Sequence, residues 1–267
     1  MSQIKTKCGL CQQVKILQNS HLIPRSVYAL ASKAFSEQAG QLSIVSHKGM
    51  YNLAKQTTKY FLCDECESIL DKRGENIVVK EFCKIKDDTV KFALLKKLNS
   101  LSGQFSSDKL TEWYFINDCE LINVNAYIHF ILGILWKMSA TKWKDKPFDS
   151  YYNILGDYYE NQIRQYLLTE NPIFLDNIYI ICLVDNKVNS YPWILFPTVK
   201  KDYFLGYAYT FIVPGVKFLV FVGKKPSVEF FYSLPNDTHI CFGKTNLDTD
   251  KDFINNIKLI RDSISLL

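Results

Sequence analysis

Two pairs of cysteines share one spacing, and zinc sites commonly use that spacing. Cys8 and Cys11 are separated by two residues, and so are Cys63 and Cys66. Two intervening residues let one tight turn present both sulfurs to the same ion, and two such turns complete a tetrahedral shell. Four unrelated buried cysteines would leave the shared spacing unexplained. We therefore predict a structural zinc site with four cysteine ligands, in which Gly9 eases the first turn.

A histidine, His21, lies between the two pairs in the sequence "SHLIPRS". Four sulfurs already fill a zinc shell, so His21 is not needed as a zinc ligand. It is then either a packed core residue or a general base, since the pKa of histidine lies near working pH.

Three carboxylates follow the last cysteine of the second pair at intervals of four residues. Glu67, Asp71 and Glu75 would therefore lie along one face of a helix. Such a face is either a solvated acidic surface or a set of oxygen ligands for a hard ion such as Mg²⁺. Gly74 weakens the predicted helix just before Glu75.

The order of these motifs resembles the zinc-containing branch of the HNH (His-Asn-His) endonucleases, which have the ββα-metal fold. The resemblance is carried by the first cysteine pair, by "SHLIPRS" at 20–26 and by "LCDECE" at 62–67. More narrowly, the chain is similar to a bacterial subgroup with SHIIPK and LCxxCE motifs and a long helical C-terminal extension. The resemblance covers residues 5–78.

The resemblance implies that His21 is the general base that activates water for attack on a phosphodiester bond. It also implies a catalytic Mg²⁺ or Mn²⁺ that stabilises the phosphate. Glu67 stands where the family has its last metal-binding histidine, so we predict it as a catalytic residue and a metal ligand. Glu75 and Asp71 are predicted as further ligands. Ser20 departs from the family, because many relatives have Asp or His there, and a neutral hydroxyl leaves the site short of charge.

The predicted partner is nucleic acid, and within the family it is DNA, in the setting of defence against foreign DNA. The net charge of +5 suits a polyanion, although a basic surface can also be merely solvated. Backbone contacts, which are salt-sensitive and sequence-blind, are predicted for five basic residues: Arg25, Lys55, Lys59, Lys72 and Arg73.

The sequence predicts an α+β chain with two domains. Residues 1–80 would form the zinc-stabilised HNH-like module, and residues 81–267 a helical region followed by an antiparallel β-sheet and a closing helix. This second domain is expected to regulate, to select substrates or to bind a second copy or another protein. Helices are expected over 23–38, 64–76, 90–98, 125–139, 151–168 and 250–267, a strand over 59–63, a loop or hairpin over 46–59, and further strands between 177 and 241.

No export signal is visible in "MSQIKTKCGL". The most apolar stretch, 121–136, is interrupted by polar residues and is too short for a membrane span. We therefore expect a cytoplasmic protein without disulfides. His129 is expected in the core or at an interface, His47 in the 46–59 loop is a candidate spare metal ligand, and no role is assigned to His239.

Three functions remain open from the sequence. The first is a metal-dependent nuclease. The second is a zinc-stabilised module on the same fold that binds nucleic acid or protein without catalysis, which the departures at Ser20 and Glu67 favour. A third reading places an unrelated activity in the β-rich part of the chain.

Overall fold

The computed structural model describes residues 4–36, 43–46, 49–52, 56–86, 89–101, 104–107, 111–114, 120–144, 151–186, 194–202, 206–223 and 239–249. The chain forms two compact units. The first unit consists of Met1–Arg25, Lys55–Val79 and Asn123–Asp176, and the second of Ser26–Ala54, Lys80–Ile122 and Asn177–Leu267. This division differs from the predicted boundary at residue 80.

The strands of the first unit form a small antiparallel sheet. Its order is β1 (Lys5–Lys7), β2 (Val14–His21) and β5 (Thr58–Cys63), and β5 is the strand expected at 59–63. α2 (Asp64–Leu70) starts directly after Cys63. The antiparallel strands β2 and β5 are therefore paired, and a helix follows β5 at once.

The helix predicted over 64–76 changes its winding part-way. α2 is followed by a π-helical turn, η1 (Asp71–Glu75), then by α3 (Asn76–Val78) and a 3₁₀ turn, η2 (Val79–Glu81). Gly74 does not break this run. A Cβ added to Gly74 would lie 2.9 Å from the backbone nitrogen of Phe130 in α5, so the glycine permits close approach of two backbones.

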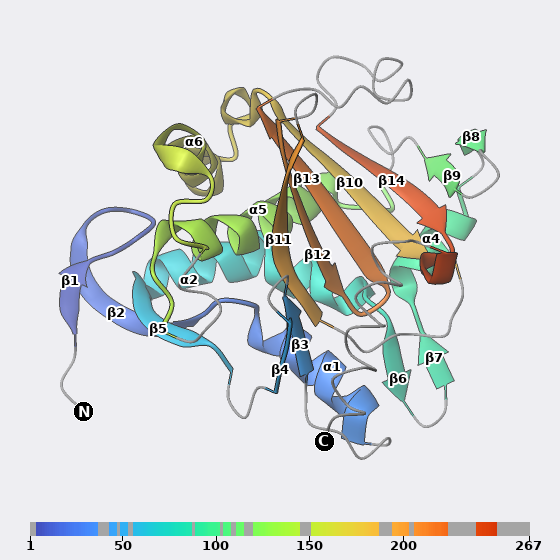
Figure 1. Ribbon diagram of the computed structural model, residues 1–267, viewed down its shortest axis with the longest axis horizontal. Helices are drawn as coiled ribbons and strands as arrows, with labels where there is room; N and C mark the ends of the chain where they lie inside the picture. The colour runs from blue at the N-terminus through green and yellow to red at the C-terminus, as the bar shows by residue number, and fades with distance from the viewer. Residues whose placement is uncertain are drawn as a thin grey trace. The chain divides into compact units, whose positions relative to one another are not determined.

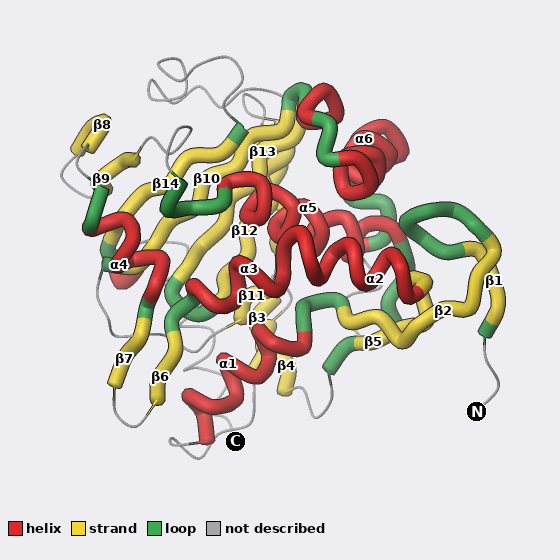
Figure 2. Tube along the Cα trace, turned by 180° about the vertical axis from the view of Figure 1, so that it is seen from behind, coloured by secondary structure: helices red, strands yellow, loops and turns green. Residues whose placement is uncertain are grey.

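Two long helices complete the first unit, as the sequence predicts, and both appear beside α2 in Figure 2. α5 (Val124–Ala140) is buried along most of its length and starts at Asn123, whose side chain accepts a hydrogen bond from the Ala126 N–H. Trp136 of α5 stacks on Phe61 of β5, with ring centroids 5.4 Å apart. α6 (Gly156–Thr169) starts at Gly156, not at 151 as predicted, packs against α5 and is followed by η4 (Pro172–Leu175). These contacts explain why residues 123–176 form one unit with the two segments that contain the cysteine pairs.

The second unit is built on a nine-stranded sheet, whose central strands are seen in Figure 1. The strand order is β4-β3-β11-β12-β13-β10-β14-β9-β8. The bounds are β3 (Ser43–Ser46), β4 (Gly49–Asn52), β8 (Gln104–Ser107), β9 (Thr111–Tyr114), β10 (Ile178–Asp185), β11 (Ile194–Asp202), β12 (Gly206–Val213), β13 (Val216–Gly223) and β14 (Ile240–Thr245).

The prediction of an antiparallel sheet is wrong at two places. β10 pairs with β14 in parallel, and β11 pairs with β3 in parallel, so the sheet is mixed. The β12–β13 hairpin turns at Pro214-Gly215 as the sequence indicates, and a tight hairpin forces antiparallel pairing. A long connection imposes no such direction, and both parallel pairs join strands that are far apart in the chain. The hairpin expected within 46–59 lies earlier, at β3–β4, and adds to this sheet.

The remaining elements are short. α1 (Arg25–Ser36) begins after Pro24, not at 23 as predicted. β6 (Lys84–Lys86) pairs with β7 (Thr89–Lys91), which occupies the start of the helix predicted at 90–98, so α4 spans only Ala93–Asn99. η5 (Leu247–Thr249) is the last described element, and the predicted closing helix at 250–267 lies outside the described residues. Among the helices in the described ranges, none is long and apolar enough to cross a membrane.

Candidate metal centre and adjoining cleft

The four cysteines of the first unit converge as the spacing predicts. The sulfur atoms of Cys8, Cys11, Cys63 and Cys66 all lie within 4.8 Å of one another, and three of the four residues are buried. The Cys11 and Cys63 sulfurs are 3.9 Å apart. A tetrahedral zinc ion with Zn–S bonds of about 2.3 Å requires sulfurs roughly 3.8 Å apart. The cluster can therefore hold a metal ion such as zinc.

The first cysteine pair is shaped by contacts with β5. The Gly9 N–H donates to the Phe61 carbonyl at 2.9 Å, and a Cβ on Gly9 would lie 2.1 Å from the Phe61 ring. Gly9 is thus required for packing against the ring. The residue with left-handed backbone in this turn is Gln12, with a φ of 64°. Gly9 is therefore needed because it lacks a Cβ, and not because it eases the backbone of the turn as predicted.

The sulfurs differ in how readily they carry charge. A hydrogen bond with the Cys66 thiol is the main cause that lowers the pKa of Cys8 to about 4, and the backbone N–H of Cys63 lowers it further. Burial is the main cause that raises the pKa of Cys63 to about 12. The cluster therefore stabilises thiolate at Cys8, and the thiolate is the form that binds metals.

A cleft of about 440 Å³ opens beside α2 and η1 in the same unit. It brings His21 together with all three carboxylates that the sequence singled out. The residues that line it are His21, Pro24, Arg25, Asp64, Glu67, Ser68, Asp71, Glu75 and Lys137.

His21 reaches the cleft because it ends β2, and its neighbour faces the other way. Ser20 is 1% exposed, and its hydroxyl accepts a hydrogen bond from the Leu62 N–H at 3.1 Å. Ser20 therefore takes part in pairing β2 with β5 and does not line the cleft. Burial is the main cause that lowers the pKa of His21, and the charge of Lys137 is the next. A lowered pKa keeps the imidazole neutral at neutral pH, which is the form that accepts a proton.

The carboxylates of the cleft have different surroundings. Glu67 Oε1 is buried without a hydrogen-bond partner, and Asp71 accepts a hydrogen bond from the Asn76 side chain. Glu75 Oε1 lies 3.3 Å from Lys137 Nζ, and burial is the main cause that raises the pKa of Glu75.

The oxygen atoms of these carboxylates are the type of ligand that Mg²⁺ prefers. They line one cleft but converge less closely than the sulfurs. Within the described residues, the four cysteines are the only group of three or more His, Cys, Asp or Glu side chains with ligand atoms inside 4.8 Å.

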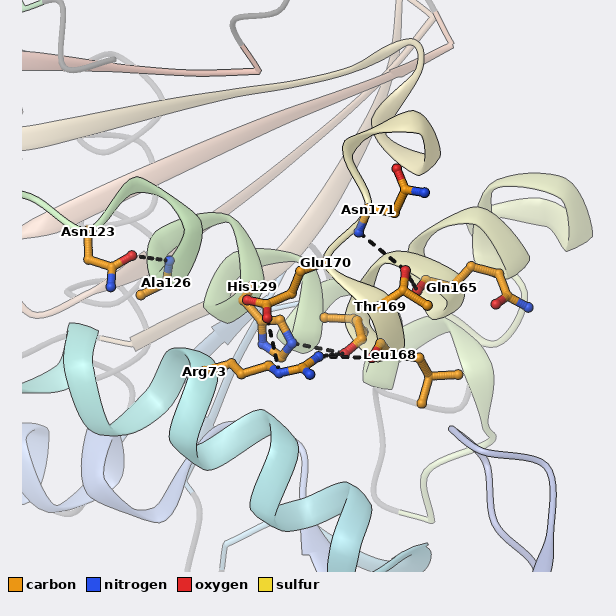
Figure 3. A network of polar contacts seen from close by, with 10 residues as sticks. Arg73, Asn123, Ala126, His129, Gln165, Leu168, Thr169, Glu170 and Asn171 are labelled. Atoms are coloured by element: carbon orange, nitrogen blue, oxygen red, sulfur yellow. Dashed lines mark hydrogen bonds and ion pairs between the residues drawn. The ribbon is translucent and has the colours of Figure 1, made fainter. Parts of the chain in front are cut away.

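Arg73, predicted to contact nucleic acid, joins η1 to the end of α6 (Figure 3). Its guanidinium donates to the carbonyls of Leu167 and Leu168 at 3.3 and 2.9 Å, and its Nε lies 3.2 Å from a Glu170 carboxylate oxygen. His129 of α5 enters the same network, with Nε2 3.0 Å from the Leu167 carbonyl. The expected burial of His129 is thus observed.

The other predicted basic contacts differ in exposure. Lys59 is half-buried, and its ammonium donates to Thr141 Oγ1 at 2.6 Å and to the Lys142 carbonyl at 2.8 Å. Arg25 and Lys72 are exposed, and Arg25 lines the cleft. The residues Lys55 and His47 lie outside the described part of the chain.

Two further charged residues line the cleft without having been predicted, Asp64 and Lys137. A signal for Lys137 was present, because it is a single charged residue within the apolar run 126–138. Charged residues are rarely buried without a partner.

No protein-family model, curated protein or solved structure matches this chain. Its function has therefore to be inferred from the arrangement of the side chains.

Proposed function

We propose that this protein is a metal-dependent HNH-like nuclease that hydrolyses phosphodiester bonds, with a structural zinc ion held by Cys8, Cys11, Cys63 and Cys66. One observation carries the proposal. His21 at the end of β2 opens onto the same cleft as Glu67, which lies on the helix that directly follows β5. A neutral histidine and a group of carboxylates in one cleft is the combination that this hydrolysis requires.

In this proposal His21 accepts a proton from the attacking water. The lowered pKa of His21 supports this role, because the imidazole is unprotonated at neutral pH. Glu67, Asp71 and Glu75 would hold Mg²⁺ or Mn²⁺, which supplies charge stabilisation at the phosphate and the leaving oxygen.

The charge of the cleft supports the need for a cation. Four carboxylates and two basic side chains line it, so its net charge is −2 when all the carboxylates are ionised and His21 is neutral. A polyanion is repelled from such a cleft, and one divalent cation cancels the charge. Arg25 and Lys72 are exposed and are the predicted basic residues best placed for DNA backbone contacts.

The second candidate function is binding of nucleic acid or protein without catalysis. It is favoured by Ser20, whose hydroxyl is bound to the Leu62 N–H and supplies no ligand to the cleft. Its signature is affinity for DNA that persists in EDTA, with no cleavage when Mg²⁺ or Mn²⁺ is added.

The test pairs zinc analysis with DNA cleavage in Mg²⁺ or Mn²⁺. We expect about one zinc per chain, and His21→Ala should lower the cleavage rate by about 10²–10⁴-fold while zinc content and melting stay unchanged. His239→Ala is the matched control, because His239 lies in the second unit beside the Ile178 carbonyl. Release of zinc by His21→Ala would show that His21 is a zinc ligand, and this would overturn the proposed catalytic role.

The pH dependence of cleavage gives a second check. Since the pKa of His21 is lowered from 6.5, the acid limb of the pH–rate profile should lie below pH 6.5. Single-turnover rates measured from pH 5 to 8 would show this. A limb centred above pH 6.5 would argue against His21 as the base.

A further inference from the structure

One lysine of the cleft is almost completely buried. The Lys137 side chain is 2% exposed, although it lines the cleft with His21. Lys137 belongs to α5, which lies far from both cysteine pairs in the sequence. Its backbone is fixed by the Trp143 indole N–H, which donates to the Lys137 carbonyl at 3.0 Å.

The ammonium of Lys137 has more donors than the protein satisfies. A lysine ammonium carries three N–H donors. In the described part of the chain, Glu75 Oε1 at 3.3 Å is the only acceptor that Lys137 Nζ has. A buried charged group with unfilled donors is costly, so its presence at a cleft points to a ligand that completes it.

The positive charge of Lys137 affects His21, the proposed general base. It is the second largest cause of the lowered pKa of His21, so its field reaches the imidazole. The surrounding carboxylates, Asp64, Glu67 and Asp71, are of opposite sign. The natural ligand for the two remaining donors is a group that brings at least two acceptor oxygens.

We propose that Lys137 binds the non-bridging oxygens of a nucleic-acid phosphate in this cleft, and that Glu75 is its counterion in the free protein. The inference rests on the proposed function and deepens it, because it names a substrate-binding residue outside the segment that resembles the HNH family. A phosphate has acceptor oxygens for the donors that the protein leaves unfilled, and a lysine binds it as a point charge.

The experiment measures DNA affinity separately from cleavage. His21→Ala is expected to slow cutting about 10²–10⁴-fold, and in that background we compare Lys137→Met, Lys137→Arg and Lys97→Met by fluorescence anisotropy. The probe is a labelled DNA duplex in Mg²⁺, titrated at several salt concentrations. Lys97 is the matched control, because it pairs with Glu81 in the second unit.

Lys137→Met should weaken binding about 10-fold or more, since it removes a charge-assisted contact. It should also lower the slope of log affinity against log salt by about 0.9, the value for one phosphate contact. Lys137→Arg should keep the slope, and Lys97→Met should change neither quantity. A purely structural lysine would not change the salt slope, so an unchanged slope in Lys137→Met overturns the proposal.

Loss of Lys137 leaves the half-buried carboxylate of Glu75 without its ion-pair partner, so the single variant can fail to fold. The double variant Lys137→Met/Glu75→Gln avoids this, because both side chains are then neutral. It is compared with Glu75→Gln alone, which carries the effect of removing a proposed metal ligand, and the slope should be lower by about 0.9 in the double variant. Zinc content and melting confirm that each variant is folded.

The two proposals fail in different ways. A wild-type protein that binds DNA without cutting it, together with a slope that falls in Lys137→Met, rejects the nuclease and keeps the phosphate contact. Cleavage by wild type with an unchanged slope in Lys137→Met rejects only the contact. A wild-type protein that does not bind DNA overturns both.

Discussion

Both units bury cysteines, but only in the first do the described cysteines form a group of four converging sulfurs. In the first unit the four sulfurs lie within 4.8 Å of one another. In the second unit Cys182 and Cys241 lie in the neighbouring strands β10 and β14, and burial raises the pKa of both thiols. Cys241 packs in a cluster with Ile181 and Phe221. The difference shows that burial alone does not bring sulfurs together for a metal ion, whereas the four converging sulfurs of the first unit can hold one.

The largest expected effect tests this contrast directly. Cys63→Ala should abolish zinc binding and unfold the first unit, because structural zinc contributes about 10–16 kcal/mol in zinc-finger peptides and a whole domain is stable by only about 5–15 kcal/mol. Cys241→Ala should keep the zinc and cost about 1 kcal/mol. Zinc stoichiometry and tryptophan fluorescence during denaturation would report both, because Trp136 and Trp143 lie in the first unit and Trp113 packs against the Cys241 cluster of the second. A normal melting profile for Cys63→Ala would contradict the contrast.

A smaller effect concerns His129 of α5, which contacts the Leu167 carbonyl. Burial is the main cause that lowers the pKa of His129 from 6.5 to about 4. Between those values the unfolded chain binds a proton and the native protein does not, so stability falls as the pH falls from 6.5 to 4. This difference corresponds to about 3 kcal/mol.

His129→Gln should remove that pH dependence while it keeps an N–H donor for the Leu167 carbonyl. Denaturant unfolding at pH 7 and pH 4 measures the change. Wild type should lose about 3 kcal/mol more than the variant over this range. The zinc cysteines contribute to both proteins and cancel in the comparison. Equal losses would show that His129 does not cause this part of the acid sensitivity.

The smallest expected effect compares one glycine from each unit. Gly74→Ala should cost about 2 kcal/mol, because the new methyl group meets the backbone of Phe130 at 2.9 Å. Gly243→Ala should cost about 1 kcal/mol or less, because its nearest neighbours are side-chain atoms of Thr111, Trp113 and Leu183, which can shift. Chemical denaturation measures both. A larger cost at Gly243 would reverse the order.

Local signals in the sequence predicted much of the candidate site. The shared spacing of the cysteine pairs predicted the sulfur cluster, and the interval of four residues placed Glu67, Asp71 and Glu75 on one cleft. Such signals succeed because a tight turn or one helix face fixes the geometry over a few residues. The helices at 125–139 and 151–168 were predicted for the same reason.

The features that were missed depend on contacts between distant segments. Lys137 joins the cleft only because α5 packs on η1, and nothing local to residues 64–75 indicates this. Arg73 appeared free for nucleic acid until α6 supplied the carbonyls that it binds. The parallel pairing of β10 with β14 is likewise decided by tertiary packing, since no tight turn joins the two strands.

The first unit consists of three segments that are separated in the sequence, so the ribosome makes them at different times. All four cysteines have been made by residue 66, but α5, which covers Phe61 and meets Gly74, begins at residue 124. At roughly 5–20 residues per second, a ribosome needs several seconds to reach the end of α5. During that time zinc, if bound, is the main restraint on a nascent segment whose apolar face is uncovered. Metal supply and translation speed are therefore expected to set the yield of folded protein together.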